Sequence, residues 1–240
     1  MPRLPFTKSP AVQHGAAPLT LAAALLSVAL SLSFAPSQSQ AADAAPAAAS
    51  AAESDPAFQS AMAVFNRATQ GDDKAIEPSV QAWRRLSAAD PTNPVPRAYL
   101  GASTTLLATT TLLPWKKMSH AEDGLALLDK ALAQLTPAHD VAVGGGVPAS
   151  LLVRFTAAST FNSLPSMFNR GERGARLLIE VLQSPAFDKT PLPFKASVWM
   201  RAAHDAQGAK RNDEARQWLN KVATSGAPQA PAAQAQLKSL

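Results

Sequence analysis

From residue 55 onward, apolar side chains recur at intervals of three and four residues, which is the spacing of one helix face. The first stripe consists of Phe58, Ala61, Met62 and Phe65. Pro56 suits the first turn of this helix, and Gly71 breaks it. Further stripes occupy residues 76–86, 95–106, 125–135, 151–158, 175–182, 194–202 and 215–222, and residues 231–240 favour a short closing helix. The pattern predicts an all-α fold.

Short polar breaks separate these helices, so consecutive helices should pack as antiparallel pairs. One pair hides only part of its apolar surface, and neighbouring pairs must therefore stack. We expect a helical-hairpin solenoid of about four antiparallel pairs plus the short C-terminal helix, formed by residues 55–240. Thr104–Leu113 is ambiguous between helix and strand. Residues 112–118 should join the third and fourth helices, with Ser119 near the start of the fourth as its cap.

Two short motifs carry a resemblance to a known family. Asp90-Pro91-Thr92-Asn93 looks like the Asp-Pro-x-Asn that ends a repeat unit, and Asn212-Asp213-Glu214-Ala215 looks like the turn that opens a second helix. On these motifs the chain resembles a degenerate tetratricopeptide-repeat protein over roughly residues 56–222, with a repeat longer than the usual length of about 34 residues. The resemblance implies a TPR-like solenoid that binds other proteins, usually through the concave face made by the first helix of each pair.

The N-terminal residues have the pattern of an export signal. Two basic residues precede the apolar run Leu19–Phe34, and small residues follow it. We expect a signal peptide over residues 1–41, cleaved after Ala41, with Ala44 as the second choice. The run is shorter than the roughly 20 residues that cross a membrane, although retention as an anchor is an alternative. Residues 42–54 predict a disordered Ala-rich linker, and the mature protein is expected in a bacterial periplasm.

The composition of the chain excludes several kinds of functional site. The chain has no Cys, which excludes disulfides, thiol catalysis and Cys-based zinc sites. Its net charge of +5 is spread among interspersed acids, so we expect no nucleic-acid partner. The four His lack ligand spacing, and Gly144–Gly146 should be a flexible joint, since no Lys-Ser/Thr follows it. We therefore expect no metal, no cofactor and no catalytic residue.

Polar side chains on the predicted first helices are candidates for a partner-binding groove. They are Asn66, Arg67, Arg97, Tyr99, Arg154, Asn162, Arg201 and His204. The Arg fork binds carboxylates bidentately, which suits capture of a peptide. Each Arg can instead cover apolar surface with its stem or bond a helix C-terminus.

Residues 112–118 combine large apolar side chains with two cations. Trp115 is either wedged into the neighbouring pair or offered to a partner, and we expect the wedged position, with Lys116 and Lys117 solvated. The alternative makes Trp115, Lys116 and Lys117 a binding patch for a protein or for an anionic membrane surface.

The sequence favours a non-catalytic adaptor or assembly factor in the cell envelope. Its partner would be a protein or peptide, with no stable membrane span after signal cleavage. Two alternatives remain open: a small-ligand-binding protein or enzyme with a pocket inside the solenoid, and a structural envelope protein. The oligomeric state also stays open.

Overall fold

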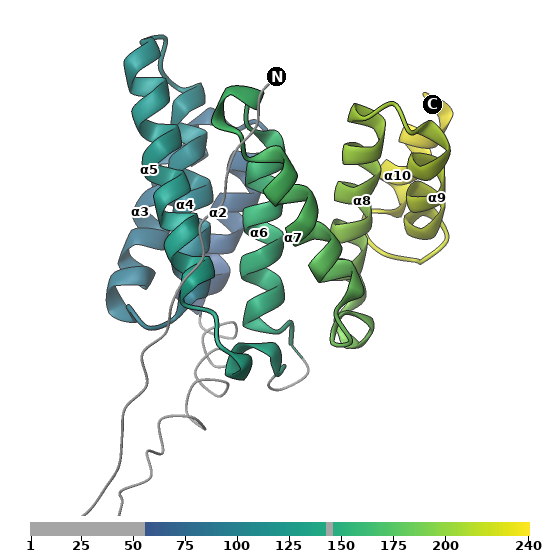
Figure 1. Ribbon diagram of the computed structural model, residues 1–240, viewed down its shortest axis with the longest axis horizontal. Helices are drawn as coiled ribbons and strands as arrows, with labels where there is room; N and C mark the ends of the chain where they lie inside the picture. Colours follow the sequence, from purple (N-terminus) through teal and green to yellow (C-terminus); the bar gives the residue numbers. More distant parts are fainter. Residues whose placement is uncertain (1–55, 143–145) are drawn as a thin grey trace, which may run out of the picture. The chain divides into compact units, whose positions relative to one another are not determined.

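The computed structural model describes residues 56–142 and 146–240, and all regular structure in these ranges is helical. The helices, labelled as in Figure 1, are α2 (Pro56–Thr69), α3 (Asp73–Ala89), α4 (Pro94–Leu106), α5 (Pro114–Ala133), α6 (Ala149–Ser163), α7 (Gly171–Gln183), α8 (Leu192–Gly208), α9 (Asn212–Ala223) and α10 (Ala230–Lys238). Short 3-10 turns η1 (Leu107–Thr109), η2 (Pro137–Asp140), η3 (Ser166–Phe168) and η4 (Phe187–Lys189) lie between them. The predicted all-α class is confirmed. The expected signal peptide, the linker and most of the Gly144–Gly146 joint lie outside the described residues.

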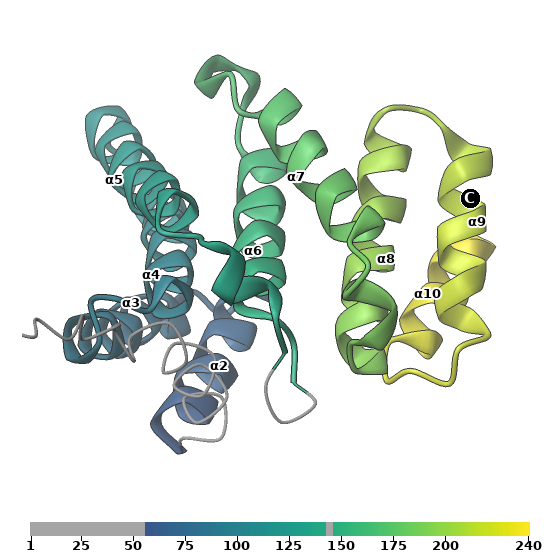
Figure 2. The same cartoon turned by 60° about the horizontal axis from the view of Figure 1, so that its bottom comes forward.

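Consecutive helices pack as adjacent pairs: α2 with α3, α4 with α5, α6 with α7, and α8 with α9, with α10 against α9. The first helices of the pairs also contact one another in order, because α4 packs on α2 and α6, and α6 reaches α8. In both views α6 lies between α4 and α8 (Figures 1 and 2). The predicted pairing of neighbouring helices is therefore confirmed.

Side chains next to the breaks fix where the early helices begin. The Asp72 carboxylate accepts a hydrogen bond from the Lys74 backbone N–H at 3.1 Å and so caps α3. The Asn93 side chain does the same for α4, accepting from the Val95 backbone N–H at 3.0 Å. Each cap satisfies a backbone donor that the first helical turn leaves unpaired.

The fourth helix starts earlier than the sequence pattern suggested. Residues 114–118 do not form a joint, because α5 begins at Pro114, whose missing N–H costs nothing at this position. Ser119 is inside the helix and not its cap, and its hydroxyl bonds the Asp123 carboxylate at 3.4 Å. The sequence predicts a start at Ser119 because Ser is a preferred helix cap and Glu122 and Asp123 follow it.

The Thr-rich stretch after Ser103 begins as helix and contains no strand, and residues 110–113 form an irregular connection. The Thr104 and Thr105 hydroxyls donate to the backbone carbonyls of Leu100 and Ala102, both at 2.7 Å. These bonds satisfy buried hydroxyls inside the helix, so the β-branched residues need no strand partner. The helix ends at Leu106 and passes into η1.

Two glycines bring α4 and α5 into very close contact. A Cβ on Gly124 would lie 2.6 Å from the Gly101 carbonyl oxygen and 2.5 Å from Cγ2 of Thr105. A Cβ on Gly101 would lie 2.8 Å from the Gly124 carbonyl oxygen and 2.9 Å from Cγ of Leu128. Real Cβ atoms do not tolerate such distances, so any larger residue at either position forces the helices apart.

An aromatic cluster joins the first pair to α4. The Trp83 ring is fully buried and stacks on Tyr99, with ring centroids 4.6 Å apart. Phe58 meets Trp83 edge-on at 5.2 Å, and Phe65 meets Tyr99 edge-on at 5.1 Å. Such pairs add to the hydrophobic gain from burying large rings. The cluster fixes α2 and α3 against α4.

We predict that Gly124→Ala lowers the free energy of unfolding by about 1–2 kcal/mol, because the added methyl overpacks the α4–α5 contact. The loss occurs although Ala favours helix over Gly by about 1 kcal/mol. Gly208→Ala is the matched control, since a Cβ there meets nothing within 4 Å. Urea denaturation compares the two variants. Equal stability of both would show that the α4–α5 contact does not require glycine.

Candidate functional site

A groove of about 1490 Å³ runs along the first helices of the pairs. Its lining comes from α2, α4, α6 and α8, with contributions from η1, the start of α5, η3 and Gln229. Figures 1 and 2 let the reader follow α2, α4, α6 and α8 through the molecule. The groove is therefore built from one helix of every pair.

The groove wall is mainly apolar, and several of its large side chains stay half-buried. These are Met62, Phe65, Met118, Phe155, Phe168 and Phe194. Phe155 and Phe194 meet edge-on at 5.5 Å and so link α6 to α8. Side chains of this kind lose water when a ligand covers them, which makes the groove an apolar binding surface.

Arg201 makes one part of the groove polar. Its side chain is only 13% exposed, and its Nε lies 2.8 Å from Asp205 Oδ1. One terminal nitrogen, Nη1, donates to the Ser163 hydroxyl at 2.9 Å. The other, Nη2, is buried and has no hydrogen-bond partner among the described residues. A buried guanidinium donor of this kind can take a carboxylate from a ligand.

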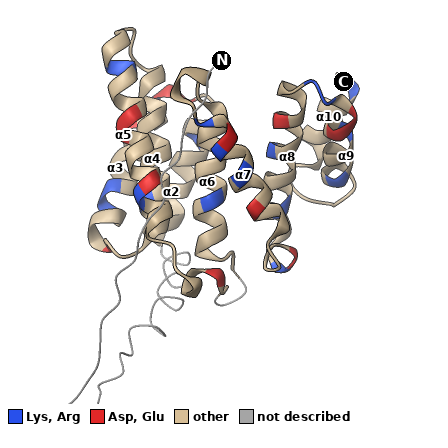
Figure 3. Ribbon diagram, in the orientation of Figure 1, with Lys and Arg blue, Asp and Glu red and all other residues tan. Residues whose placement is uncertain are grey.

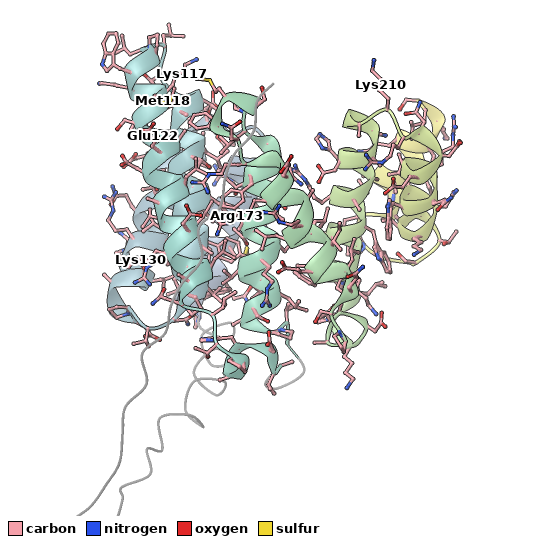
Figure 4. All side chains as sticks on the ribbon, in the orientation of Figure 1. Lys117, Met118, Glu122, Lys130, Arg173 and Lys210 are labelled. Atoms are coloured by element: carbon pink, nitrogen blue, oxygen red, sulfur yellow. The ribbon has the colours of Figure 1, made fainter. Side chains whose placement is uncertain are left out.

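Three of the predicted partner-binding residues line the groove: Tyr99, Lys117 and Arg201. Asn66, from the wider set of candidates, lines it as well. Tyr99 is buried and stacked on Trp83, so its ring forms the groove floor. Lys117 is exposed near the start of α5 beside Met118, as Figure 4 shows.

Arg67 and Arg97 hold turns together and do not line the groove. Arg67 pairs with the Asp72 carboxylate, with Nη2 and Oδ2 2.5 Å apart. Arg97 is buried, donates to the Pro91 carbonyl at 2.9 Å and also bonds the side chain of Gln134. Arg97 thereby ties the turn before α4 to the end of α5.

Arg154 and Asn162 also lie outside the groove. Arg154 contacts Asp140 at 3.2 Å and Glu180 at 3.3 Å, beside a separate hollow of about 360 Å³. Asn162 donates to the Asp205 carboxylate at 2.6 Å. His204, on α8, is exposed beside that same carboxylate. These contacts position α6 against its neighbours.

Trp115 is not wedged into a neighbouring pair, so that expectation is wrong. Its side chain is 67% exposed at the start of α5, and Lys116 beside it is exposed as well. The helix begins at Pro114, and this places Trp115 in the exposed first turn. Neither Trp115 nor Lys116 lines the groove.

Sequence reasoning missed the half-buried apolar residues of the groove. Met62, Phe65, Phe155 and Phe194 were assigned to helix faces that pack in the core. They do contact the core, but part of each remains open to the groove. The spacing of apolar positions does not show which residues of a helix face are covered by the core and which remain exposed in a groove.

Charges of both signs are interspersed over the helices, as Figure 3 shows, and several form small opposite-sign groups. Asp129 on α5, for example, accepts from both Arg170 and Arg173. Among residues 56–142 and 146–240 there is no group of three or more His, Asp or Glu arranged to hold a metal ion. No helix within those ranges is both long enough and apolar enough to span a membrane.

Comparison of the chain with known protein families, with curated proteins and with solved structures finds no match. Its function is therefore argued from the groove itself.

The Arg67–Asp72 pair predicts a pH effect on stability. The hydrogen bond from Arg67 holds the pKa of the Asp72 carboxyl below its ordinary value. A lowered pKa stabilises the fold above the ordinary Asp value, and this contribution is lost as pH falls through the folded pKa. Asp72→Asn keeps a good helix cap but removes the charge. The variant should be less stable than the native chain at pH 7, with the gap closing below about pH 4.

Urea denaturation at pH 7 and at pH 3 measures this gap. Asp73→Asn is the control, because Asp73 lies next in the chain without an ion pair to Arg67. A destabilisation by Asp72→Asn that is as large at pH 3 as at pH 7 would contradict the charge-based explanation.

Proposed function

We propose that this chain is an exported, non-catalytic interaction protein that binds an apolar segment of a protein partner along the groove. It would act as an adaptor or assembly factor in the cell envelope. The observation that carries the proposal is the groove of about 1490 Å³, with half-buried Met and Phe side chains that no described part of the chain covers.

The size of the groove supports a protein segment as its occupant. Pockets for small molecules usually enclose about 300–1,000 Å³. This groove is larger, and its lining comes from four successive pairs. An amphipathic helix has a diameter of about 10 Å and presents apolar residues at regular intervals along one face. Such a helix suits a wall with Met and Phe side chains from several helices.

The charged residues of the groove indicate which charge the partner segment should carry. No Asp or Glu is among the described residues that line the groove, whereas Lys117 and Arg201 are. The buried Nη2 of Arg201 has no hydrogen-bond partner among the described residues. The partner segment that fits best is therefore apolar along one face and carries at least one carboxylate.

Two further parts of the proposal rest on the sequence. The TPR-like solenoid rests on the repeat-like motifs, and the adjacent pairs and the groove on their first helices agree with it. A location in the bacterial periplasm rests on the signal-like pattern of residues 1–41.

A pull-down from a bacterial envelope extract tests the groove. We expect the native chain to recover a specific partner. Met62→Gln together with Met118→Gln should weaken recovery roughly tenfold or more, because two apolar contacts become polar. Both side chains are half-buried, so the fold should tolerate the change.

Ile179→Gln is the matched control, since Ile179 is 50% exposed on α7 and does not line the groove. It should retain the partner. Absence of any specific partner, or full recovery by the double variant, would contradict the proposal. Thermal stabilisation by a small metabolite, without a protein partner, would favour the alternative of a small-ligand-binding protein.

A further inference from the structure

The connection between α4 and α5 exposes an unusual group of apolar side chains. We call residues 110–117 the α4–α5 tip. Within it Leu112 is 92% exposed, Trp115 67% and Leu113 39%. Leu112, Leu113 and Trp115 lie within four positions of the chain, whereas large apolar residues that are exposed elsewhere in the described chain occur singly. An exposed group of this kind needs a partner surface to be favourable.

The lengths of the helices place the tip at one end of the α4–α5 pair. Gly101 and Gly124 mark the level at which α4 and α5 touch. From Gly124 the helix α5 continues about 15 Å back to Pro114, whereas α4 continues about 8 Å from Gly101 to Leu106 and η1, which packs on α5, adds about 6 Å. The start of α5 therefore extends past the end of α4 to the level of η1, and Figure 4 shows Lys117 at this end of α5.

The charged side chains of the tip itself are positive. Lys116 and Lys117 are both exposed, and no Asp or Glu occurs from Pro91 through Ala121. The first acids, Glu122 and Asp123, follow more than one turn later on α5, and Figure 4 shows Glu122 there. Figure 3 shows the same end of α5 in blue. The tip thus joins apolar side chains to two cations that form no ion pair within the described part of the chain.

We propose that the α4–α5 tip is a reversible contact with an anionic lipid surface. Leu112, Leu113 and Trp115 enter the boundary between headgroups and acyl chains, where an indole is favoured. Lys116 and Lys117 remain at the level of the lipid phosphates and pair with them.

Shape favours a lipid surface over a protein partner. A stable protein interface buries about 800 Å² on each side and needs a matching surface. The tip is a projecting end with three apolar side chains, and the groove, which is the large concave surface, contains only Pro114 and Lys117 of it. A bilayer accepts a small projecting group without shape complementarity. With only two Lys and three apolar groups the contact is weak and salt-sensitive.

Quenching of Trp115 fluorescence by brominated lipids tests the contact in the full chain. The chain has four Trp, and the other three are Trp83, Trp199 and Trp218, all buried or half-buried. Brominated vesicles that contain phosphatidylglycerol should quench the native chain, and Trp115→Phe should remove most of that quenching. Vesicles of brominated phosphatidylcholine alone should quench it far less.

The lysines and Leu112 supply the matched variants. Each Lys near an anionic surface contributes about 1 kcal/mol, so Lys116→Gln with Lys117→Gln should reduce tip partition roughly 30-fold, read from the quenched fraction. Leu112→Ser should also reduce it. Lys189→Gln with Lys210→Gln removes two exposed cations elsewhere and should change nothing. All variants keep Leu19–Phe34, so any lipid binding by that run is common to them.

Equal quenching of Trp115→Phe and the native chain would overturn the proposal. Equal quenching by phosphatidylcholine, or an unchanged signal in the Lys116 and Lys117 variant, would overturn it as well. Absence of quenching by every vesicle would exclude the lipid contact and leave the tip as a contact for a protein. Lys117 also lines the groove, so its variant is read for the lipid contact through Trp115 quenching alone, and the Met62 and Met118 variant tests the groove separately.

Discussion

The distance between the two helices of a pair is the constraint on which the rest of the structure depends. At the centre of α4–α5 that distance is set by Gly101 and Gly124, where even a methyl group would collide with backbone. Gly174 has the same role in α6–α7, because a Cβ there would collide with the side chain of Asn162. Ala215 is fully buried on α9. Small residues therefore let α5 and α7 cover their first helices tightly.

Tight pairing leaves part of each first helix for other contacts. The first helices contact one another across the pairs, and the side chains left over form the groove. Met62 and Phe155 show this double role, because each packs against the core and also lines the groove. One apolar face thus supplies both the folding energy and the binding surface that we propose. The α4–α5 tip arises differently, since it consists of the connection after η1 and the first turn of α5.

The spacing of apolar residues predicted the helices and their pairing because burial of one face is a local property of the sequence. It misplaced the start of α5, since Trp115 and Lys116 precede the apolar stripe. The sequence pattern also did not distinguish an arginine that lines the groove, Arg201, from one that is buried against Gln134, Arg97. The contacts that each arginine makes involve residues distant in the sequence, which come together only in the folded chain.

Site-specific photo-crosslinking from the groove tests the central claim most directly. A photoreactive amino acid placed at Thr160, which lines the groove, should capture a protein segment in cells. The same amino acid at Glu77, exposed on α3 outside the groove, should not capture it. Mass spectrometry of the Thr160 adduct should identify an apolar segment that contains an acidic residue. No adduct at Thr160, or the same adduct at both positions, would contradict a binding groove on the first helices.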